Sequence, residues 1–228
     1  MPEEIFDKKQ ILNLIRGAKH IGIVPSKMSL VDSLSAAVGL YFMILDELDK
    51  EELRKEDRKT VNLVFDEDIP EGCSAILTKD DITSKIADRE LHVTIDYSGT
   101  GADAFRWTND KQVLSVFLGP VEKDFDRNRI KSNVVGFDFD IVFIIGMQGY
   151  EDIEQMYATI SKEVKRSRII NLDNTSLNSR YGYVNIVDTA ADTLSLLVLQ
   201  KAIEWGLKPN TKAAKALLNG ITSLPVAK

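Results

Sequence analysis

The side chains best suited to chemistry follow short apolar runs of the sequence. Ser26 and Lys27 come directly after residues 20–25, and the segment Asp-Asn-Thr-Ser at 173–176 follows residues 168–172. Ligands of open α/β folds bind beyond the carboxyl ends of parallel strands. If both apolar runs are such strands, these polar residues lie where a ligand would bind. Ser26 and Lys27, beside the predicted start of a helix, are the best candidates for a phosphate contact.

The first part of the chain has the pattern of a strand, a helix and a second strand. Residues 20–25, His-Ile-Gly-Ile-Val-Pro, lack polar alternation, which predicts a buried strand. From Leu30 to Leu48, apolar residues recur at steps of three and four, as in a buried helix. Residues 60–66 predict the second strand. A connection of this length indicates a βαβ unit with parallel strands.

The alternation of buried strands and helices resumes after residue 140. Apolar runs at 141–145, 168–172 and 183–187 predict further strands, and helical periodicity predicts helices at 153–164, 190–205 and 211–218, the last ended by Gly220. The predicted fold class is therefore α/β, a Rossmann-like parallel sheet with helices on both faces.

Residues 67–135 differ from the rest of the chain. Leu91, Val93, Ile95 and Tyr97 alternate with polar residues, and residues 105–108 and 113–118 predict a hairpin. We interpret 67–135 as an antiparallel β-rich insertion in a single domain, 1–228. His92 is expected to be a surface residue of its strand. Trp107 and Trp205 are expected to pack against other residues.

Composition excludes several classes of protein. A chain of 228 residues, 44% of them hydrophobic, is long enough to bury a core unaided. The longest apolar run, 36–45, is too short to span a bilayer, and the acidic N-terminus is unlike a secretory signal. We therefore expect a cytoplasmic protein that does not cross a membrane.

The scarcity of cysteine and histidine limits the possible metal sites. Cys73 is the single cysteine, so it forms no internal disulfide, and His20 and His92 are the only histidines. A Cys/His zinc site therefore lacks ligands. The net charge of −6 also argues against a broad nucleic-acid-binding face. Neither a G-x-G-x-x-G nor a G-x-x-x-x-G-K-[ST] motif is present.

The last third of the sequence carries a family resemblance. The segment RIINLDNTSLNSRYGYVNIVD at 168–188, then AADTLSLLVL at 190–199 and ALLNGI at 216–221, resembles the DHH phosphoesterase family. That family includes single-strand exonucleases, nanoRNases, cyclic-dinucleotide phosphodiesterases and manganese pyrophosphatases. The first strand and helix resemble its H-x-x-P-D-x-D segment. The resemblance implies the α/β fold already predicted and covers most of the chain outside the insertion.

Most motif residues of that family are replaced in this sequence. Its histidine falls on Ser26, its proline on Ser29, and its two aspartates on Leu30 and Asp32. The middle-strand aspartate falls on Gly146, the D-H-H triplet on Asp173-Asn174-Thr175, and the late aspartate on Leu224.

The resemblance implies what the remaining residues would do. Asp32 would be a direct metal ligand, and Asp173 with Asn174 would form the remains of the catalytic triplet. A two-metal centre clamps two phosphoryl oxygens between cations, and leucine, glycine and threonine supply no charge for such ions. One Mn²⁺ or Mg²⁺ is the most that these residues would hold, and no cofactor at all is an open alternative.

Three functions remain open from the sequence. The first is a degenerate phosphoesterase-like protein that acts as a ligand-binding or interaction module. The second is an active metal-dependent phosphoesterase on nucleotides or short oligonucleotides, using Asp32, Asp173 and Asn174. The third is a scaffold that binds another protein through its insertion hairpin, which an exposed apolar patch at Phe105 and Trp107 would support.

Structural roles are equally open for the candidate residues. Asp32, three residues after Ser29, has the spacing of a helix N-terminal cap. The segment 173–176 is also an ordinary turn sequence. The family usually carries a second, substrate-binding domain, which is expected to be absent from a chain that stops at Lys228. The oligomeric state is left undetermined by the sequence.

Overall fold

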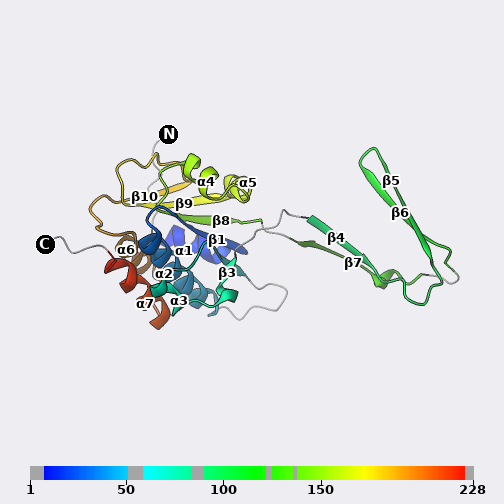
Figure 1. Ribbon diagram of the computed structural model, residues 1–228, viewed down its shortest axis with the longest axis horizontal. Coiled ribbons are helices and arrows are strands. Elements are labelled where there is room, and N and C mark those ends of the chain that lie inside the picture. The colour runs from blue at the N-terminus through cyan, green and yellow to red at the C-terminus, as the bar shows by residue number, and fades with distance from the viewer. Residues whose placement is uncertain (1–7, 51–58, 84–89, 122–124, 136–137, 224–228) are drawn as a thin grey trace. The chain divides into compact units, whose positions relative to one another are not determined.

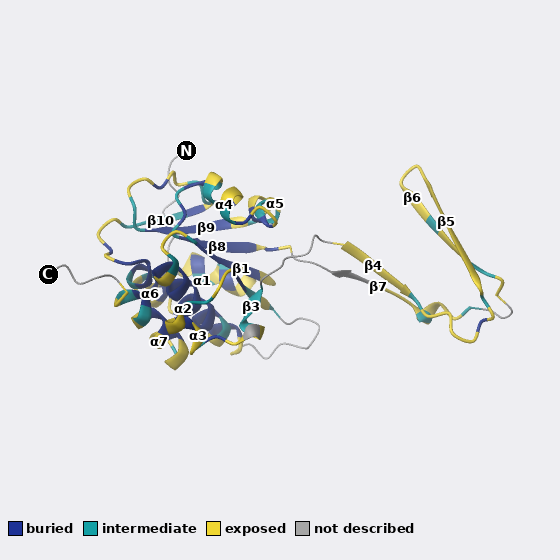
Figure 2. Ribbon diagram, viewed as in Figure 1, coloured by how far each residue is buried: buried dark blue, intermediate teal, exposed yellow. Residues whose placement is uncertain are grey.

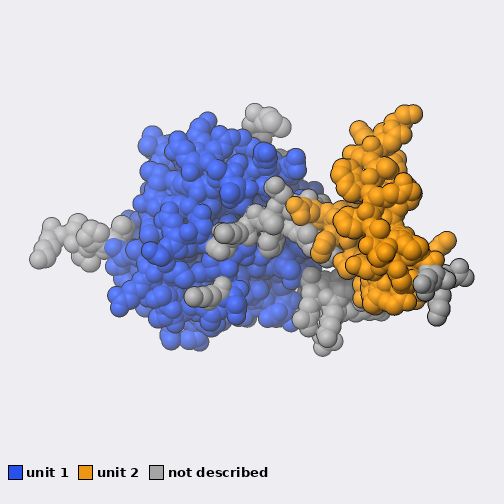
Figure 3. Space-filling model, turned by 45° about the vertical axis from the view of Figure 1, so that its right-hand side comes forward, with its two compact units in different colours: residues 1–86, 137–228 blue, residues 87–136 orange. Residues whose placement is uncertain are grey.

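The computed structural model describes residues 8–50, 59–83, 90–121, 125–135 and 138–223. The chain divides into two compact units, coloured separately in Figure 3. Unit 1 comprises residues 1–86 and 137–228, and unit 2 comprises residues 87–136. The segment 67–86, which the sequence analysis included in the insertion, groups with unit 1.

Unit 1 is built on a six-stranded sheet of parallel strands in the order β10-β9-β8-β1-β2-β3 (Figure 1). Its strands are β1 (His20–Pro25), β2 (Thr60–Val64), β3 (Ile82–Thr83), β8 (Ile141–Ile145), β9 (Arg168–Asp173) and β10 (Val184–Val187). The central strand β8 is buried along its whole length, because both faces of a parallel sheet are covered. The predicted α/β class is confirmed.

Helices cover both faces of this sheet. They are α1 (Lys8–Gly17), α2 (Leu30–Leu48), α3 (Glu71–Ser74), α4 (Tyr150–Met156), α5 (Ser161–Arg166), α6 (Leu194–Glu204) and α7 (Thr211–Ile221). One apolar cluster joins a sheet face to α1, α2, α6 and α7, and a second joins the other face to α4 and α5. Figure 2 shows the buried sheet between these layers.

Three helices differ from the predicted boundaries. The segment 153–164 forms two helices because the chain turns at Tyr157, whose hydroxyl donates to the Pro25 carbonyl at 2.7 Å. Helix α6 begins at Leu194 because the Thr193 side chain caps it. Helix α7 continues through Gly220, where the missing side chain allows α6 to approach closely.

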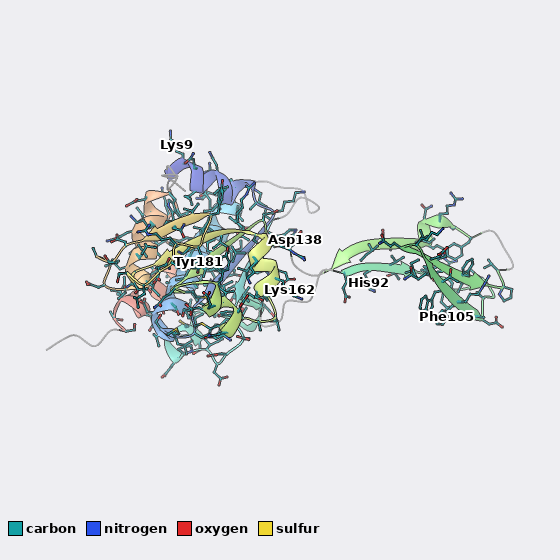
Figure 4. The ribbon with its side chains drawn as sticks, turned by 90° about the horizontal axis from the view of Figure 1, so that it is seen from above. Lys9, His92, Phe105, Asp138, Lys162 and Tyr181 are labelled. Atoms are coloured by element: carbon teal, nitrogen blue, oxygen red, sulfur yellow. The ribbon has the colours of Figure 1, made fainter. Side chains whose placement is uncertain are left out.

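Unit 2 consists of two antiparallel ribbons. Strand β4 (Glu90–Ile95) pairs with β7 (Ile130–Val135), and β5 (Ala104–Asp110) pairs with β6 (Val113–Gly119). The second pair is the hairpin that the sequence predicts. His92 is exposed on β4, as expected (Figure 4). The expectation that both tryptophans are packed is wrong for Trp107, which is 64% exposed, and confirmed for Trp205. No helix in the described part of the chain is both long and apolar enough to cross a membrane.

Candidate functional site at the carboxyl edge of the sheet

The strand order defines where a ligand would bind to this sheet. From β1 the chain adds β2 and β3 on one side, and later β8, β9 and β10 on the other. The order therefore reverses between β1 and β8, which is the point at which open α/β sheets bind ligands. Ser26 follows β1 and Gly146 follows β8 at this reversal. The sequence analysis selected the end of β1 at this reversal, and its second choice, 173–176, lies at the end of the neighbouring strand β9.

The crevice at the reversal is filled by the protein itself. Gly146 has a φ of 75°, and a Cβ atom placed there would lie 2.6 Å from Leu194 Cδ1 and 3.4 Å from Ser26 Cβ. Leu194 is 3% exposed, so its side chain is packed into this place. Any side chain at position 146, an aspartate included, would require Leu194 to move. An apolar side chain thus occupies the place where the resembled family has a carboxylate.

The Asp32 carboxylate caps the start of α6. Its Oδ2 accepts a hydrogen bond from the Leu194 backbone N–H at 2.7 Å, and its Oδ1 accepts one from the Ser195 N–H at 2.9 Å. The Ser195 hydroxyl donates to the Asp32 carbonyl. The proposed helix-capping role thus applies to α6 instead of α2, since Ser29 makes no side-chain cap on α2. A carboxylate at a helix N-terminus is stabilised by the helix dipole.

The N-terminus of α6 retains no free donor for an external anion in its first turn. Asp32 takes the N–H groups of Leu194 and Ser195, the Thr193 hydroxyl accepts from Leu196, and the Thr193 carbonyl accepts from Leu197. A helix N-terminus binds phosphate through such N–H groups. Here an internal carboxylate and a capping threonine already satisfy them.

Ser26 and Lys27, the predicted phosphate contacts, are engaged with neighbouring groups. Ser26 is fully buried, and its hydroxyl accepts a hydrogen bond from the Met28 N–H at 3.1 Å. The Lys27 ammonium lies 2.6 Å from Asp66 Oδ1 and 4.5 Å from the centre of the Tyr157 ring. An ammonium held between a carboxylate and an aromatic face has lost most of its attraction for a phosphate.

A hollow that Asp66, the ion-pair partner of Lys27, helps to line has acidic walls. It has a volume of about 670 Å³, and it is lined by Leu30, Phe65, Asp66, Glu67, Asp68, Ile69 and Ile82. Three successive carboxylates along one wall repel a phosphodiester. The hollow therefore does not complement the substrate class of the resembled family.

Asp173, at the end of β9, belongs to a buried polar network. Its Oδ2 accepts a hydrogen bond from Asn178 Nδ2 at 2.8 Å, and its Oδ1 accepts one from the Asn174 N–H at 2.8 Å. Asn178 Nδ2 also donates to the Met147 carbonyl at 2.9 Å. The Asn174 side chain points elsewhere, because its amide donates to the Ala191 carbonyl. Asp173 and Asn174 are adjacent in sequence, but their side chains serve different partners.

Two further asparagines extend this network, and the sequence analysis missed both. Asn171 and Asn185 lie opposite each other on β9 and β10, and Asn171 Nδ2 donates to Asn178 Oδ1 at 2.8 Å and to Asn185 Oδ1 at 3.0 Å. A signal was present: both residues interrupt otherwise apolar strand runs. Buried amides need hydrogen-bond partners, so such an interruption indicates a polar network.

Burial raises the pKa of Asp173 above its ordinary value of 3.8, although the hydrogen bonds from Asn178, Asn174 and Thr175 oppose this shift. The folded state thus holds the Asp173 proton more tightly than the unfolded state does. This contribution to stability is fully present below pH 3.8 and is lost as the pH rises through the folded pKa. Carboxyl NMR resonances followed during an acid titration should show Asp173 titrating above pH 3.8.

Asp96 in unit 2 is the internal control for that titration. Hydrogen bonds from Ser98 and Arg129 lower its pKa below 3.8. The two aspartates should therefore titrate on opposite sides of the ordinary value. A titration of Asp173 at or below that of Asp96 would contradict the expected effect of burial.

The donor set at this edge does not fit a two-metal centre. In the described ranges, no group of three or more His, Cys, Asp or Glu side chains is arranged to hold a metal ion. The carboxylate oxygens of Asp32 and Asp173 accept hydrogen bonds from N–H groups of the protein. The Asn174 amide nitrogen donates to a backbone carbonyl. Divalent cations need several oxygen ligands converging on one point. The arrangement supports structure more directly than metal chemistry.

The fold and the carboxyl-edge site define an open, doubly wound α/β protein with an inserted β unit. No protein-family model matches the chain, and no curated protein sequence matches it either. Among solved structures, it is similar to an exopolyphosphatase-related protein from Bacteroides fragilis, with a TM-score of 0.58 and 13% identity. The match covers 95% of this chain and 49% of that one, so the chain spans about half of its length. At this identity the likeness shows a shared fold.

Proposed function

We propose that this protein is a degenerate phosphoesterase-like protein of the DHH type, which binds a ligand or another protein and does not hydrolyse phosphoesters. The observation that carries the proposal is the engagement of Asp32, whose two carboxylate oxygens accept from two backbone N–H groups of α6. A carboxylate in this position would have to give up the helix cap in order to bind a cation.

Two other features of the edge support the proposal. Leu194 fills the place beside Gly146 from which a further carboxylate would have to project. Asp173 is held in an amide network with Asn178. Both features replace charge by packing or by neutral hydrogen bonds, and a two-metal mechanism depends on that charge. The fold shared with an exopolyphosphatase-related protein supports the phosphoesterase-like part of the proposal.

The rival function is hydrolysis of a nucleotide or short oligonucleotide by one Mn²⁺ or Mg²⁺ held by Asp32, Asp173 and Asn174. It would require α6 to release Asp32 and the Ala191 carbonyl to release the Asn174 amide. Each release leaves buried backbone groups without a hydrogen-bond partner, at about 1–3 kcal/mol apiece. The rival function is therefore energetically less favourable than the structural roles of the same residues.

A direct assay distinguishes the two functions. The purified chain is incubated with Mn²⁺ and either a short oligonucleotide or a cyclic dinucleotide, and Mn²⁺ binding is measured in parallel by calorimetry. We expect neither turnover nor Mn²⁺ binding, because the oxygens of Asp32 and Asp173 already accept protein hydrogen bonds.

Variants of the carboxylates test whether any observed turnover depends on Asp32 and Asp173. Turnover in the wild-type chain that Asp32→Ala or Asp173→Ala abolishes, while Asp188→Asn at the end of β10 retains it, would overturn the proposal. Circular dichroism of all three variants checks that they fold. Turnover that persists in every variant identifies a contaminating enzyme and leaves both carboxylates in structural roles.

Interaction through the insertion is a second candidate function, favoured by a specific observation. Phe105 is 78% exposed and Trp107 is 64% exposed. Large aromatic side chains this exposed indicate a surface that another molecule covers. This function is compatible with the first, because unit 2 and the carboxyl edge of the sheet are formed by different residues.

A further inference from the structure

The β5–β6 ribbon has one apolar face. Directly opposed residues of paired strands point to the same side, and the pairs on this side are Phe105 with Leu118, Trp107 with Val116, and Asn109 with Leu114. Figure 4 labels Phe105 on this ribbon. The face contains no charged residue, and Phe105, Trp107, Leu114 and Val116 are each more than half exposed.

The opposite face of the same ribbon is more polar, although Val113 and Phe117 on it are also exposed. It carries the pairs Arg106 with Phe117 and Thr108 with Ser115. The Arg106 guanidinium lies 4.2 Å from the centre of the Phe117 ring, so the ring on this side is partly covered from within the ribbon and is 42% exposed. The two faces therefore differ as the inner and outer faces of a packed sheet differ.

The second ribbon of unit 2 presents apolar side chains to the same place. Val93 and Ile95 on β4, together with Phe105, Val116 and Leu118 of the other ribbon, line a hollow of about 250 Å³. Leu91 and Val93 are 69% and 49% exposed on the same side of β4. The apolar faces of both ribbons thus open onto one continuous surface, which we call the ribbon surface.

Two-stranded ribbons with one bare apolar face are poorly stable in water. An isolated hairpin is marginal at best, and stability requires further strands or packing against that face. With roughly 150–250 Å² per large aromatic side chain, the exposed parts of Phe105 and Trp107 alone amount to on the order of 300 Å². Leu91, Val93, Leu114 and Val116 bring the area close to the roughly 800 Å² that each partner contributes to a standard interface.

The chemistry of the ribbon surface favours a second copy of the same chain. The surface that binds it must itself be apolar and uncharged, and the ribbon surface of a second copy meets this requirement. Unit 2 carries nearly equal numbers of acidic and basic residues, so two copies of it do not repel one another. A face that meets its own copy about a two-fold axis forms the commonest closed assembly of soluble proteins. A nucleic acid or an anionic membrane would require a basic surface, which this face lacks.

We propose that two copies of this chain associate through the ribbon surface of unit 2, each copy covering Phe105, Trp107, Leu114 and Val116 of the other. The hollow between the ribbons receives an aromatic side chain from the partner copy, since the ribbon surface of each copy offers the exposed rings of Phe105 and Trp107 as well as this hollow. The dimer does not depend on what the carboxyl edge of the sheet binds, so a failure of the proposed function leaves it untouched.

Two measurements on the full 228-residue chain test this proposal. Sedimentation velocity from low to high micromolar concentration should show the mass of a dimer. The Trp205→Phe variant leaves Trp107 as the single tryptophan, so its emission should shift to shorter wavelength in the same concentration range in which the mass doubles. Both readouts use an unaltered ribbon surface.

A pair of substitutions then locates the contact. Val116→Asp places a charge on the ribbon surface and should weaken the dimer about a hundredfold or more, because a carboxylate would be buried without a partner. Thr108→Asp places the same charge on the opposite face and should leave the dimer intact.

Three outcomes would overturn the proposal. The first is a monomer at every concentration, whether Trp107 emission is long-wavelength throughout or already short because the chain covers its own ribbon surface. The second is a dimer that Val116→Asp and Thr108→Asp weaken equally, which would place the contact elsewhere. The third is an emission shift of Trp107 that occurs on lipid vesicles and not with rising protein concentration, which would make the occupant a membrane.

Discussion

Replacing Asn178 by alanine is expected to destabilise unit 1 by about 3–5 kcal/mol, because it leaves the buried Asp173 carboxylate without its side-chain partner. The same substitution removes the donor to the Met147 carbonyl and the acceptor for Asn171. Each buried group that loses its partner adds a desolvation penalty. Urea denaturation monitored through the buried Trp205 measures the change in the free energy of unfolding.

Asn174→Ala is the matched control for that variant. Asn174 is four residues earlier on the same loop, and its side chain donates one hydrogen bond, to the Ala191 carbonyl. Its replacement should cost about 1 kcal/mol. If Asn178→Ala costs no more than Asn174→Ala, the network does not stabilise the end of β9, and the structural role argued for Asp173 fails with it.

All strands of the parallel sheet except β3 were predicted from the sequence, because burial acts on short stretches of sequence. Residues 141–145 form a short run of β-branched and aromatic residues without a polar interruption, which is typical of a strand covered on both faces. The helix boundaries were harder to predict because they depend on distant residues. Nothing near Gly220 in the sequence shows that α6 lies against it, so a glycine that ordinarily ends a helix remains inside one.

The candidate site was only half predictable for the same reason. The sequence places Asp32 near the start of the helix that follows the first strand, and Asp173 at the end of a strand, and the structure finds both residues there. The groups that occupy their oxygens are partly local, as Asn174 and Asn178 are for Asp173, and partly distant, as Leu194 and Ser195 are for Asp32. A contact across 162 residues has no local signature. Motif spacing therefore locates a carboxylate without showing whether its oxygens are free to bind a cation.

The two carboxylates at the carboxyl edge are held by hydrogen bonds within the protein. A metal centre concentrates negative charge that only cations relieve, so losing the cations would leave repelling carboxylates in a buried place. Here Asp32 accepts hydrogen bonds from the N-terminus of α6, and Asp173 accepts them from the Asn178 side chain and the Asn174 backbone N–H. An apolar side chain and neutral asparagines fill the remaining space. These contacts satisfy both carboxylates within the protein, which supports the proposed function.

Replacing Gly220 in α7 by valine should destabilise unit 1 strongly, because α6 and α2 approach α7 closely at this glycine. A Cβ atom at position 220 would overlap the Ser195 hydroxyl and would lie 2.8 Å from both Ser195 Cβ and Ser35 Cβ. The substitution therefore forces α7 away from α6 and α2, and it pushes Ser195 off the Asp32 carboxylate. We expect a loss of about 3 kcal/mol or more in the free energy of unfolding, measured by urea denaturation.

The glycine near the end of α1 provides the control. A Cβ atom at Gly17 would meet nothing within 4 Å, so Gly17→Ala should be neutral or stabilising by about 0.5–1 kcal/mol. A second comparison tests the cause. Gly220→Ala should cost less in a Ser195→Ala background than in the wild type, because the hydroxyl that it overlaps is gone. An equal cost in both backgrounds would show that Ser195 does not limit the approach of α7, and that the α6 cap on Asp32 is independent of this packing.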